Sequence, residues 1–377
     1  MSGNIKEYIK YIARGISPLY NNDGIIVLNQ KCIRNQKISL EESRIHNIHK
    51  KSVSEDKILH NFDVLINSTG VGTLGRVAQV KNIKDKMTVD SHITIVRPNL
   101  EKIDGEFFGY CIKVQESFIE TLGTGATGQT ELSRDAILDN VVIPHYSKEN
   151  QRKIAKILSN YDDLIENNNK RIKLLEEMAQ KIYKEWFVDF KYPGHETATF
   201  KDTELGKLVM PKKGKNITKA TIKEGNIPVV AGGLEPAYYH NVANTVAPIV
   251  TVSASGANAG YVKLYYEDIW ASDCSYIDNS MTPYVYYFYL YLKYNQIRVT
   301  NLQKGAAQPH VYPQDLASLK IFDIDTEIVK QFNVLVTPIF ENIKNITSKN
   351  KILRQTRDLL LPRLMSGEID VEDLEIN

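Results

Sequence analysis

Two long stretches of the chain alternate apolar and polar residues with the period of an α-helix. The first covers residues 147–187 and the second covers residues 325–361. Apolar residues recur in both at three- and four-residue steps, which places them on one face of a helix. At 1.5 Å per residue the first helix would be on the order of 60 Å long, well above the usual length in globular proteins. Two such helices most simply bury their apolar faces on each other as a coiled coil.

The ends of both helices are marked in the sequence. Ser147 suits an N-cap position, and Pro193-Gly194 prevents the first helix from continuing. The second helix is predicted to stop at Pro362. Pro338 departs from the pattern, because a proline inside a helix removes a hydrogen bond and usually kinks it. The alternative to a coiled coil is a core helix in each of two globular domains, but neither apolar face shortens as that packing would require.

Polar residues interrupt both apolar faces. They are Asn168 or Asn169 in the first stretch and Asn350 in the second. A buried asparagine often fixes the register of paired helices at some cost in stability. A solvated position on the helix surface is the other interpretation, and the sequence leaves both open.

The segments before the helices, residues 1–146 and 191–324, resemble each other. Both are rich in short apolar runs and in Gly, Asn and Asp, which predicts strands joined by turns and a few helices. Such a long-period repeat indicates two copies of one device. The matching runs are GIIVL at 24–28 with GNIPVV at 225–230, STGVGTLG at 68–75 with SASGANAG at 253–260, and GATGQ at 125–129 with GAAQ at 305–308. The fold class is therefore α+β, with two mixed globular domains and two long helices.

The composition limits the number of domains and the kinds of partner, but it does not identify the protein. A length of 377 residues suggests two to three domains. A net charge of +2 permits nucleic acid as a partner without demanding it. The isolated cysteines Cys32, Cys111 and Cys274 argue against a zinc site or disulfide framework and fit a reducing cytosol. The sequence shows no signal peptide and no run long enough to cross a bilayer. We expect a cytoplasmic protein without membrane association.

Two phosphate-binding motifs almost fit. Gly70, Gly72 and Gly75 have the spacing of a dinucleotide fingerprint, with Asp90 about twenty residues on. Residues 76–80, however, are predicted to form a strand rather than the helix whose N-terminus would hold a pyrophosphate. The run from Gly123 to Thr130 mimics a phosphate-binding loop but lacks its lysine. No other catalytic motif appears, so we expect no catalytic residue, no metal site and no cofactor on this chain.

Several motifs, in this order along the chain, resemble the specificity subunit of type I restriction–modification enzymes. They cover essentially the whole sequence, and their succession is more specific than any one of them. The motifs are RGISP at 14–18, NQKCIR at 29–34, INSTGVGTLGR at 66–76, QRKIA at 151–155, ELG at 204–206 and LLPRLMSGEI at 360–369.

The resemblance implies an architecture and a function. Target-recognition domains at 1–146 and 191–324 would alternate with helical spacers at 147–190 and 325–377, the helices forming an antiparallel coiled coil with a pseudo-twofold relation. Each domain would read one half of a bipartite site in double-stranded DNA, and the helices would set the spacing. Two methyltransferase subunits would dock on the helices, bind S-adenosylmethionine and methylate adenine N6. A motor-nuclease subunit, which uses ATP and Mg²⁺, would join them.

Polar residues in the repeated turns are the candidates for contacts with DNA. Arg, Asn, Gln and His can pair with base edges, whereas Ser, Thr and Lys more often hold phosphates. A turn-stabilising or solvated role is the alternative for each. The candidates are Asn29, Gln30, Lys31, Arg34, Ser68, Thr69, Arg76, His92, Thr127 and Gln129 in the first half, and Ser253, Ser255, Asn258, Lys263, Lys304, Gln308 and His310 in the second.

Two other classes of protein remain as alternatives. One is a Rossmann-type oxidoreductase that uses a dinucleotide cofactor. The other is a coiled-coil adaptor without a nucleic-acid role.

Overall fold

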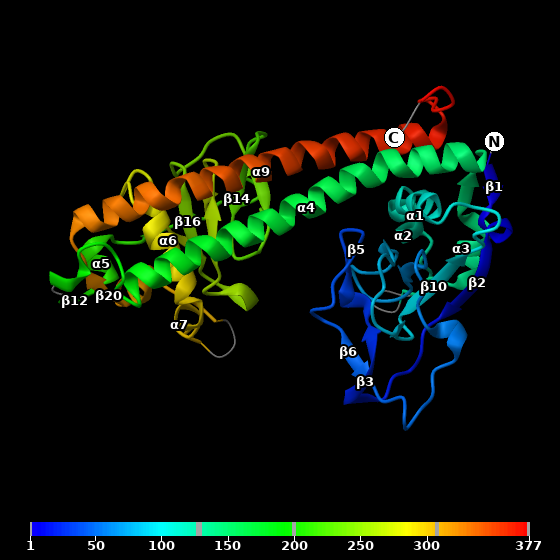
Figure 1. Ribbon diagram of the computed structural model, residues 1–377, viewed down its shortest axis with the longest axis horizontal. Coiled ribbons are helices and arrows are strands. Elements are labelled where there is room, and N and C mark those ends of the chain that lie inside the picture. The colour runs from blue at the N-terminus through cyan, green and yellow to red at the C-terminus, as the bar shows by residue number, and fades with distance from the viewer. Residues whose placement is uncertain (1, 126–129, 198–200, 306–308, 375–377) are drawn as a thin grey trace. The chain divides into compact units, whose positions relative to one another are not determined.

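The computed structural model describes residues 2–125, 130–197, 201–305 and 309–374, and its contacts divide the chain into two compact units (Figure 1). Unit 1 comprises residues 1–166 and 351–377, and unit 2 comprises residues 167–350. Each unit therefore contains one globular segment and about half of each long helix. In the described residues, no helix is long and apolar enough to cross a membrane.

The two long helices are α4 (Lys148–Phe187) and α9 (Thr326–Ser366). The predicted start of α4 is confirmed, since the hydroxyl of Ser147 accepts a hydrogen bond from the backbone N–H of Asn150 at 3.2 Å. The predicted end of α9 at Pro362 is wrong, and Pro338 does not interrupt the helix either. Both proline rings lie on the exposed side, where water can satisfy the carbonyl that a proline leaves unpaired.

Unit 1 is built around a four-stranded antiparallel sheet and a smaller sheet beside it. The order of the larger sheet is β2-β10-β7-β8, and that of the smaller is β6-β3-β9, in which β3 and β9 are parallel. The strands of unit 1 are β1 (Ser2–Asn4), β2 (Ile9–Arg14), β3 (Tyr20–Leu28), β4 (Ile33–Arg34), β5 (Lys37–Ile38), β6 (Arg44–His46), β7 (Val64–Asn67), β8 (Val77–Gln79), β9 (Met87–Val89), β10 (Ile93–Pro98) and β11 (Val142–Pro144).

Unit 2 repeats this topology. Its four-stranded sheet has the order β13-β19-β16-β17, and its three-stranded sheet has the order β15-β14-β18 with β14 parallel to β18. The outer pair β1-β11 of unit 1 corresponds to β12-β20. The strands of unit 2 are β12 (Lys201–Glu204), β13 (Lys212–Lys213), β14 (Ile227–Val230), β15 (Tyr238–His240), β16 (Ile249–Ser253), β17 (Val262–Tyr265), β18 (Trp270–Ala271), β19 (Cys274–Asp278) and β20 (Lys320–Asp323).

Both units also contain short helices. Unit 1 has α1 (Gly105–Lys113), α2 (Glu116–Thr121) and α3 (Arg134–Asn140), and unit 2 has α5 (Leu205–Leu208), α6 (Val285–Tyr294), α7 (Gln296–Thr300) and α8 (Pro313–Ala317). Single 3₁₀ turns are η1 (Ile5–Glu7), η2 (Gln30–Cys32), η3 (Glu55–Lys57), η4 (His195–Thr197) and η5 (Gly256–Asn258). Three short helices follow most of the strands in each unit, α1 to α3 in unit 1 and α6 to α8 in unit 2, while α5 precedes the main sheets of unit 2 as η1 does in unit 1.

A matched pair of glycines supports the repeat at the level of single residues. Gly75 and Gly260 have positive φ angles of 82° and 83°. A Cβ on Gly75 would lie 2.5 Å from Cα of Glu120 in α2, and one on Gly260 would lie 2.8 Å from Cα of Thr300 in α7. Because both positions require glycine for the same two reasons, the predicted duplication is confirmed.

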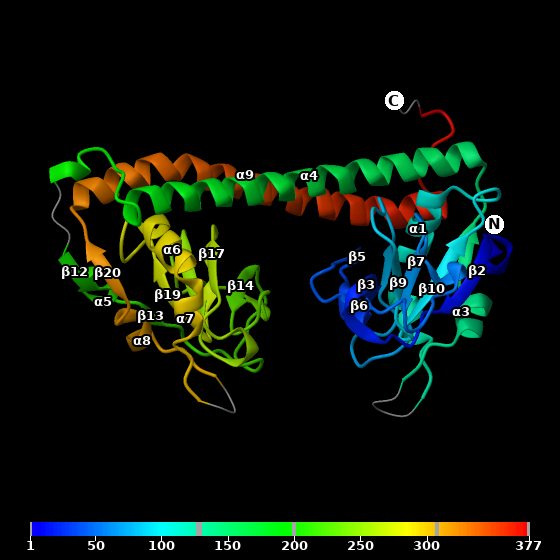
Figure 2. The same cartoon turned by 60° about the horizontal axis from the view of Figure 1, so that its bottom comes forward.

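In each unit a short helix lies between the four-stranded sheet and the long helices (Figure 2). In unit 2 this is α6, in which Tyr286, Tyr287, Tyr289 and Tyr291 are buried and Tyr294 is exposed. The ring centroid of Tyr287 lies 4.9 Å from that of Phe187 in α4, and Phe187 in turn lies 4.8 Å from Phe332 in α9. In unit 1, α1 packs between the sheet and Leu158 of α4 and Leu364 of α9 in the same way.

The predicted asparagines do meet in the helix pair of unit 2. The side-chain amide of Asn168 donates to Oδ1 of Asn350 at 2.8 Å, and Asn350 donates to Oδ1 of Asn169 at 3.0 Å. Asn350 is 1% exposed. Since Phe332 packs against Phe187 while Asn350 pairs with Asn168, the two helix segments of this unit are antiparallel.

The helix segments of unit 1 are joined to the globular segment by a partly buried charged cluster. Asp162 of α4 accepts hydrogen bonds from Arg357 of α9 at 2.5 Å and from the hydroxyl of Tyr110 at 2.7 Å. Burial acts to raise the pKa of Asp162, but Lys113, Tyr110 and Arg357 outweigh it and the net effect is a lowered pKa. Burial also lowers the pKa of Lys113 to about 8. The cluster therefore favours the ionised form of Asp162.

Replacing Arg357 by Met should lower the free energy of unfolding by about 1–3 kcal/mol at pH 7, because Asp162 loses a charged partner. A carboxylate with a lowered pKa stabilises the fold above its unfolded pKa of about 3.9, and that contribution is lost as the pH falls through the lower folded value. The difference between wild type and Arg357→Met should thus shrink below about pH 4. Urea unfolding at several pH values measures it.

Arg363→Met is the matched control, because its ion pair with Glu368 is exposed and should contribute under about 1 kcal/mol. Equal losses in the two variants would contradict the assignment of a structural role to the Asp162 cluster.

Candidate nucleic-acid interface

A tight turn follows the central strands β7 and β16 in the two units. In unit 1 the turn closes with a hydrogen bond from the N–H of Gly75 to the carbonyl of Asn67 at 2.8 Å. The turn of unit 2 closes in the same way, from Gly260 to Ser253 at 2.8 Å. Gly75 lies eight residues after Asn67, whereas Gly260 lies seven residues after Ser253. The first turn is therefore one residue longer.

This extra residue corrects the predicted alignment of the repeat. The sheet register pairs Asn67 with Ile93 in unit 1 and Ser253 with Cys274 in unit 2. Asn67, not Ser68, is thus the counterpart of Ser253. The prediction that Ser68 corresponds to Ser253 is wrong by one position, because it was anchored on the glycines at the far ends of turns of unequal length. Thr69 instead corresponds to Ser255.

The turns hold one hydroxyl against the residue that precedes the neighbouring strand. In unit 1, Oγ1 of Thr69 lies 2.7 Å from Nδ1 of His92. In unit 2, the hydroxyl of Ser255 donates to the carboxylate of Asp273. His92 and Asp273 are equivalent, because each accepts through its carbonyl from the turn, from Ser68 at 2.8 Å and from Ala254 at 3.1 Å.

In each unit, a third segment pairs through its backbone with the residue that carries this hydroxyl. The backbone of Glu131 bridges to both Thr69 and Thr124 in unit 1. In unit 2 the backbone of His310 bridges to Ser255 and Lys304. Three loops therefore converge in each unit, and the convergent faces are defined here by Thr69, His92 and Glu131 in unit 1 and by Ser255, Asp273 and His310 in unit 2.

Among the predicted contacts, Thr69, His92, Ser255, His310 and Lys304 come together on these faces. Lys304 forms an ion pair with Asp315. The ring of His310 stacks on that of Tyr312 with centroids 5.9 Å apart. His92 is exposed and the others are at least partly exposed, so all can meet a ligand.

Gln30 and Asn258 lie beside the same turns. The carbonyl of Gln30 accepts from the side chain of Asn67 at 3.0 Å. In unit 2 the carbonyl of Gly232 accepts from Asn258 and from Ser253, both at 3.2 Å. Gln30 and Gly232 therefore occupy equivalent positions, and only the first carries a side chain.

The prediction that Ser68 and Ser253 contact DNA is corrected, because both side chains are buried. Ser68 is 0% exposed, and its hydroxyl lies 2.5 Å from that of Thr94. Ser253 is 6% exposed and donates to a backbone carbonyl. Ser68 directly follows β7 and Ser253 ends β16, and neither presents its hydroxyl at the surface.

Asn29, Lys31 and Lys263 have local roles in the structure. Asn29 caps η2, since its Oδ1 accepts from the N–H of Lys31 at 2.8 Å and its amide donates to the carbonyl of Glu42. The side chain of Lys31 is exposed. Lys263 donates to the carbonyl of Leu234 at 2.6 Å and lies over the ring of Tyr265.

Arg34 and Arg76 are not part of the convergent face of unit 1. They line a separate cavity of about 700 Å³ together with Lys113, Arg357 and acidic residues. Arg76 also donates to the carbonyl of Gly72 at 2.7 Å. The predicted contacts Thr127, Gln129 and Gln308 lie outside the described residues.

Three residues of this surface, Asp273, Arg14 and Glu131, were not among the contacts predicted from the sequence. Asp273 is equivalent to His92, as shown above. Arg14 ends β2 and forms an ion pair with Glu131 at 2.5 Å. Arg14 lies within the RGISP motif, which could have drawn attention to it, but its partner is more than a hundred residues away.

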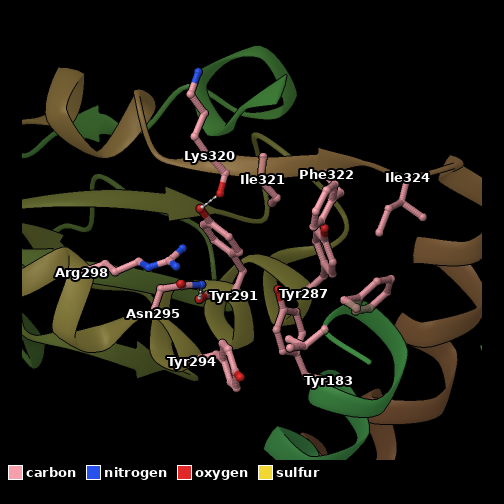
Figure 3. Close-up of a pocket in the computed structure, with 12 residues that line it drawn as sticks. Tyr183, Tyr287, Tyr291, Tyr294, Asn295, Arg298, Lys320, Ile321, Phe322 and Ile324 are labelled. Atoms are coloured by element: carbon pink, nitrogen blue, oxygen red, sulfur yellow. Dashed lines mark hydrogen bonds between the residues drawn. The ribbon is translucent and has the colours of Figure 1, made fainter. Parts of the chain in front are cut away.

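A cavity of about 270 Å³ in unit 2 is lined by Tyr183, Tyr287, Tyr291 and Tyr294 (Figure 3). The hydroxyl of Tyr291 donates to the carbonyl of Lys320 at 2.8 Å. The polar lining of the cavity consists of these tyrosines, Asn295, Arg298 and Lys320, without Asp, Glu, His, Cys or Ser. Across the described residues, no three His, Cys, Asp or Glu side chains are grouped to hold a metal ion.

The glycine motif after β7 leads into strand β8, as predicted, and not into a helix. A dinucleotide fingerprint requires the N-terminus of a helix at this point. The turn therefore positions Thr69 rather than a pyrophosphate.

Comparison with known proteins agrees with this geometry. Residues 6–177 and 196–352 match a family described as type I restriction modification DNA specificity domain. The chain belongs to the specificity subunits of type I restriction–modification systems. It is 27% identical over 365 residues to the type I restriction enzyme MjaIX specificity subunit of Methanocaldococcus jannaschii, covering 87% of this chain and 83% of that protein.

Other relatives extend the match. A putative type I specificity subunit of Mycoplasma pneumoniae is 27% identical over 303 residues, which are 74% of this chain and 78% of the relative. The S subunit of a type I system from M. genitalium has the same fold, with a TM-score of 0.59 at 18% identity over 97% of this chain and 96% of that one. The family match accounts for both globular segments, which are two target-recognition domains.

The buried serine and the neighbouring threonine of this specificity subunit should respond differently to substitution. Ser68→Ala leaves the buried hydroxyl of Thr94 without its partner and should lower the free energy of unfolding by about 1–2 kcal/mol. It should leave the preferred DNA sequence unchanged. Thr69→Ala, one residue on, should cost less stability and alter the preference of the first recognition domain. Urea unfolding and selection of bound DNA from a random pool measure the two effects. An altered preference in a stably folded Ser68→Ala variant would contradict the buried, structural assignment.

Proposed function

We propose that each target-recognition domain binds one half of a bipartite site in double-stranded DNA through its convergent face. The observation that carries the proposal is the repeated frame with different side chains. Thr69 and His92 stand in the first domain where Ser255 and Asp273 stand in the second. A shared backbone places the groups in the same way, while the side chains differ in what they can donate and accept. Two such faces suit two half-sites of unlike sequence.

Cations near each face supply contacts to phosphates. Arg14 ends β2 and Lys213 ends β13 at equivalent register positions, opposite Thr94 and Ser275. Lys31 and Lys304 are exposed on the adjoining loops. Such contacts fix orientation and provide affinity, and base contacts provide sequence preference.

The long helices are proposed to form an antiparallel coiled-coil spacer on which two methyltransferase subunits dock. Each unit exposes large apolar side chains on these helices, a feature typical of protein interfaces. Leu164, Ile352 and Leu359 do so in unit 1, and Leu174, Met178, Val334 and Leu335 do so in unit 2. One apolar set per unit fits one methyltransferase subunit per unit.

The bond chemistry is proposed to belong to the partners. The methyltransferase subunits would bind S-adenosylmethionine and methylate N6 of a flipped adenine. The motor-nuclease subunit would use ATP and Mg²⁺. The contribution of this chain would be to place the DNA, with no catalytic residue of its own. Neither alternative class, a dinucleotide-dependent oxidoreductase or an adaptor without DNA, accounts for the duplicated faces.

DNA affinity should fall steeply with salt, because each phosphate contact releases counterions on binding. Lys31→Ala should weaken binding to the first half-site and reduce the salt slope by about one, because Lys31 is exposed on the loop beside the convergent face of unit 1. Preference at the second half-site should stay unchanged. Arg152→Ala on the exposed side of α4 removes the same charge outside the recognition domain and is the control. If Lys31→Ala keeps the affinity and salt slope of the control, the loop that carries Lys31 does not contact DNA.

The helix pair should act as a ruler between the half-sites. Seven residues inserted after Lys170 and seven after Ser348 keep both apolar faces in phase and lengthen the pair by about 10 Å. The unread gap in selected DNA should grow by about three base pairs at roughly 3.4 Å each. Affinity should also fall, because about 10.5 base pairs make a turn and three of them rotate one half-site relative to the other.

Two-residue insertions at the same points are the control, since they put the apolar faces out of phase and should reduce folding. Selection from a random DNA pool decides the outcome. An unchanged gap with the seven-residue insertions would mean that the helices do not set the spacing.

A further inference from the structure

The two convergent faces carry a histidine and a carboxylate at two equivalent positions, in opposite order. At the start of the strand beside the turn, unit 1 has His92 and unit 2 has Asp273. On the bridging segment, unit 1 has Glu131 and unit 2 has His310. A histidine and a carboxylate thus occur in both faces, in swapped places on one backbone frame. The swap changes where hydrogen-bond donors and acceptors stand without changing the fold.

Asp273 is held ready to accept hydrogen bonds. The hydroxyl of Ser255 donates to Oδ2, and no described residue donates to Oδ1 or forms an ion pair with the carboxylate. The side chain is partly exposed. Lys304, on the segment that pairs with His310, forms its ion pair with Asp315. The carboxylate therefore keeps free acceptor capacity at the surface.

The residue beside Asp273 has no side chain, whereas its counterpart in unit 1 is a glutamine. Gly232 occupies the position of Gln30, as the equivalent hydrogen bonds to their carbonyls show. A Cβ on Gly232 would lie 3.4 Å from Oδ2 of Asp273 and 2.9 Å from the carbonyl oxygen of Ser255. A side chain at this position would therefore lie against the carboxylate.

A carboxylate on a DNA-binding face has few compatible partners. Phosphates repel it, and an ionised carboxylate can only accept hydrogen bonds. The donors that base pairs present in the major groove are the exocyclic amino groups of cytosine N4 and adenine N6. His92 differs, since Thr69 holds its Nδ1 and leaves Nε2 at an exposed position, from which an imidazole can also donate. The two domains therefore present different patterns at the same point.

We propose that Asp273 is a specificity-determining residue of the second recognition domain and selects a base pair by accepting from its exocyclic amino group. Ser255 is the positioning residue that orients the carboxylate, and His92 reads a different base pair at the equivalent point of the first half-site. This inference rests on the proposed function, in which the convergent faces meet DNA.

Selection of bound DNA from a random pool by the full-length chain tests the proposal. Asp273→Asn should change the preference at one base pair of the second half-site by about 5- to 150-fold, the range of one good base contact, and leave the first half-site unchanged. Asp273→His should move that preference to a different base. Asp268→Asn is the matched control, because that exposed carboxylate accepts from the N–H of Ala247 away from the face and should change nothing.

Ser255 provides a second variant should Asp273→Asn fail to fold. Ser255→Ala should weaken the same base preference, and Ser255→Thr should restore it, because threonine holds the equivalent place in unit 1. A Ser255→Ala chain with unweakened preference would overturn the positioning role.

Two failures can be told apart. If the wild-type chain selects no bipartite sequence, the proposed function fails and the inference fails with it. If the wild-type chain selects one and the folded Asp273→Asn and Asp273→His chains select the same sequence, the proposed function stands and the inference about Asp273 is wrong.

Discussion

Packing of the long helices against the buried helix of each recognition domain is the constraint on which the rest of the structure depends. In unit 2, Phe187 contacts both Tyr287 of α6 and Phe332 of α9. α6 packs in turn on the four-stranded sheet whose central strand leads into the turn that carries Ser255. Since protein cores are close-packed, the sheet cannot shift against the helix segments without opening a cavity. Each convergent face is therefore fixed relative to the helix segments of its own unit.

The polar groups in the helix pair provide specificity of pairing at a cost in stability. Asn350 is almost fully buried and bonds to both Asn168 and Asn169. An apolar residue would bury more favourably, but it would permit a shift by one turn of the helix, whereas a misplaced asparagine leaves buried groups unpaired. Asp162 and Arg357 impose a similar restriction in unit 1. Register matters for a chain whose helices are proposed to measure a distance.

The helices and the duplication were predictable from the sequence because both rest on local patterns. The apolar period gave the start of α4 and its end at Phe187 within one residue. It failed at Pro362, where the ring is exposed and water can satisfy the carbonyl that the proline leaves unpaired. The sheet order was not predictable, since strands such as β13 and β18 have two residues each and pair with distant partners.

The site was predictable only in part, for a related reason. Thr69, His92, Ser255 and His310 were candidate contacts from the sequence, and the structure places all four on the convergent faces. Asp273 was missed because its equivalence to His92 depends on sheet register, and one additional residue in the first turn displaced the alignment. That displacement also shows how the frame tolerates change. The hydrogen bonds of Gly75 and Gly260 close turns of different length on the same strands, so residues within the turn can vary while the sheet stays fixed. A recognition surface built on such turns can change its hydrogen-bonding pattern by substitution at a few exposed positions. His92 and Asp273 are the instance that this chain carries within itself.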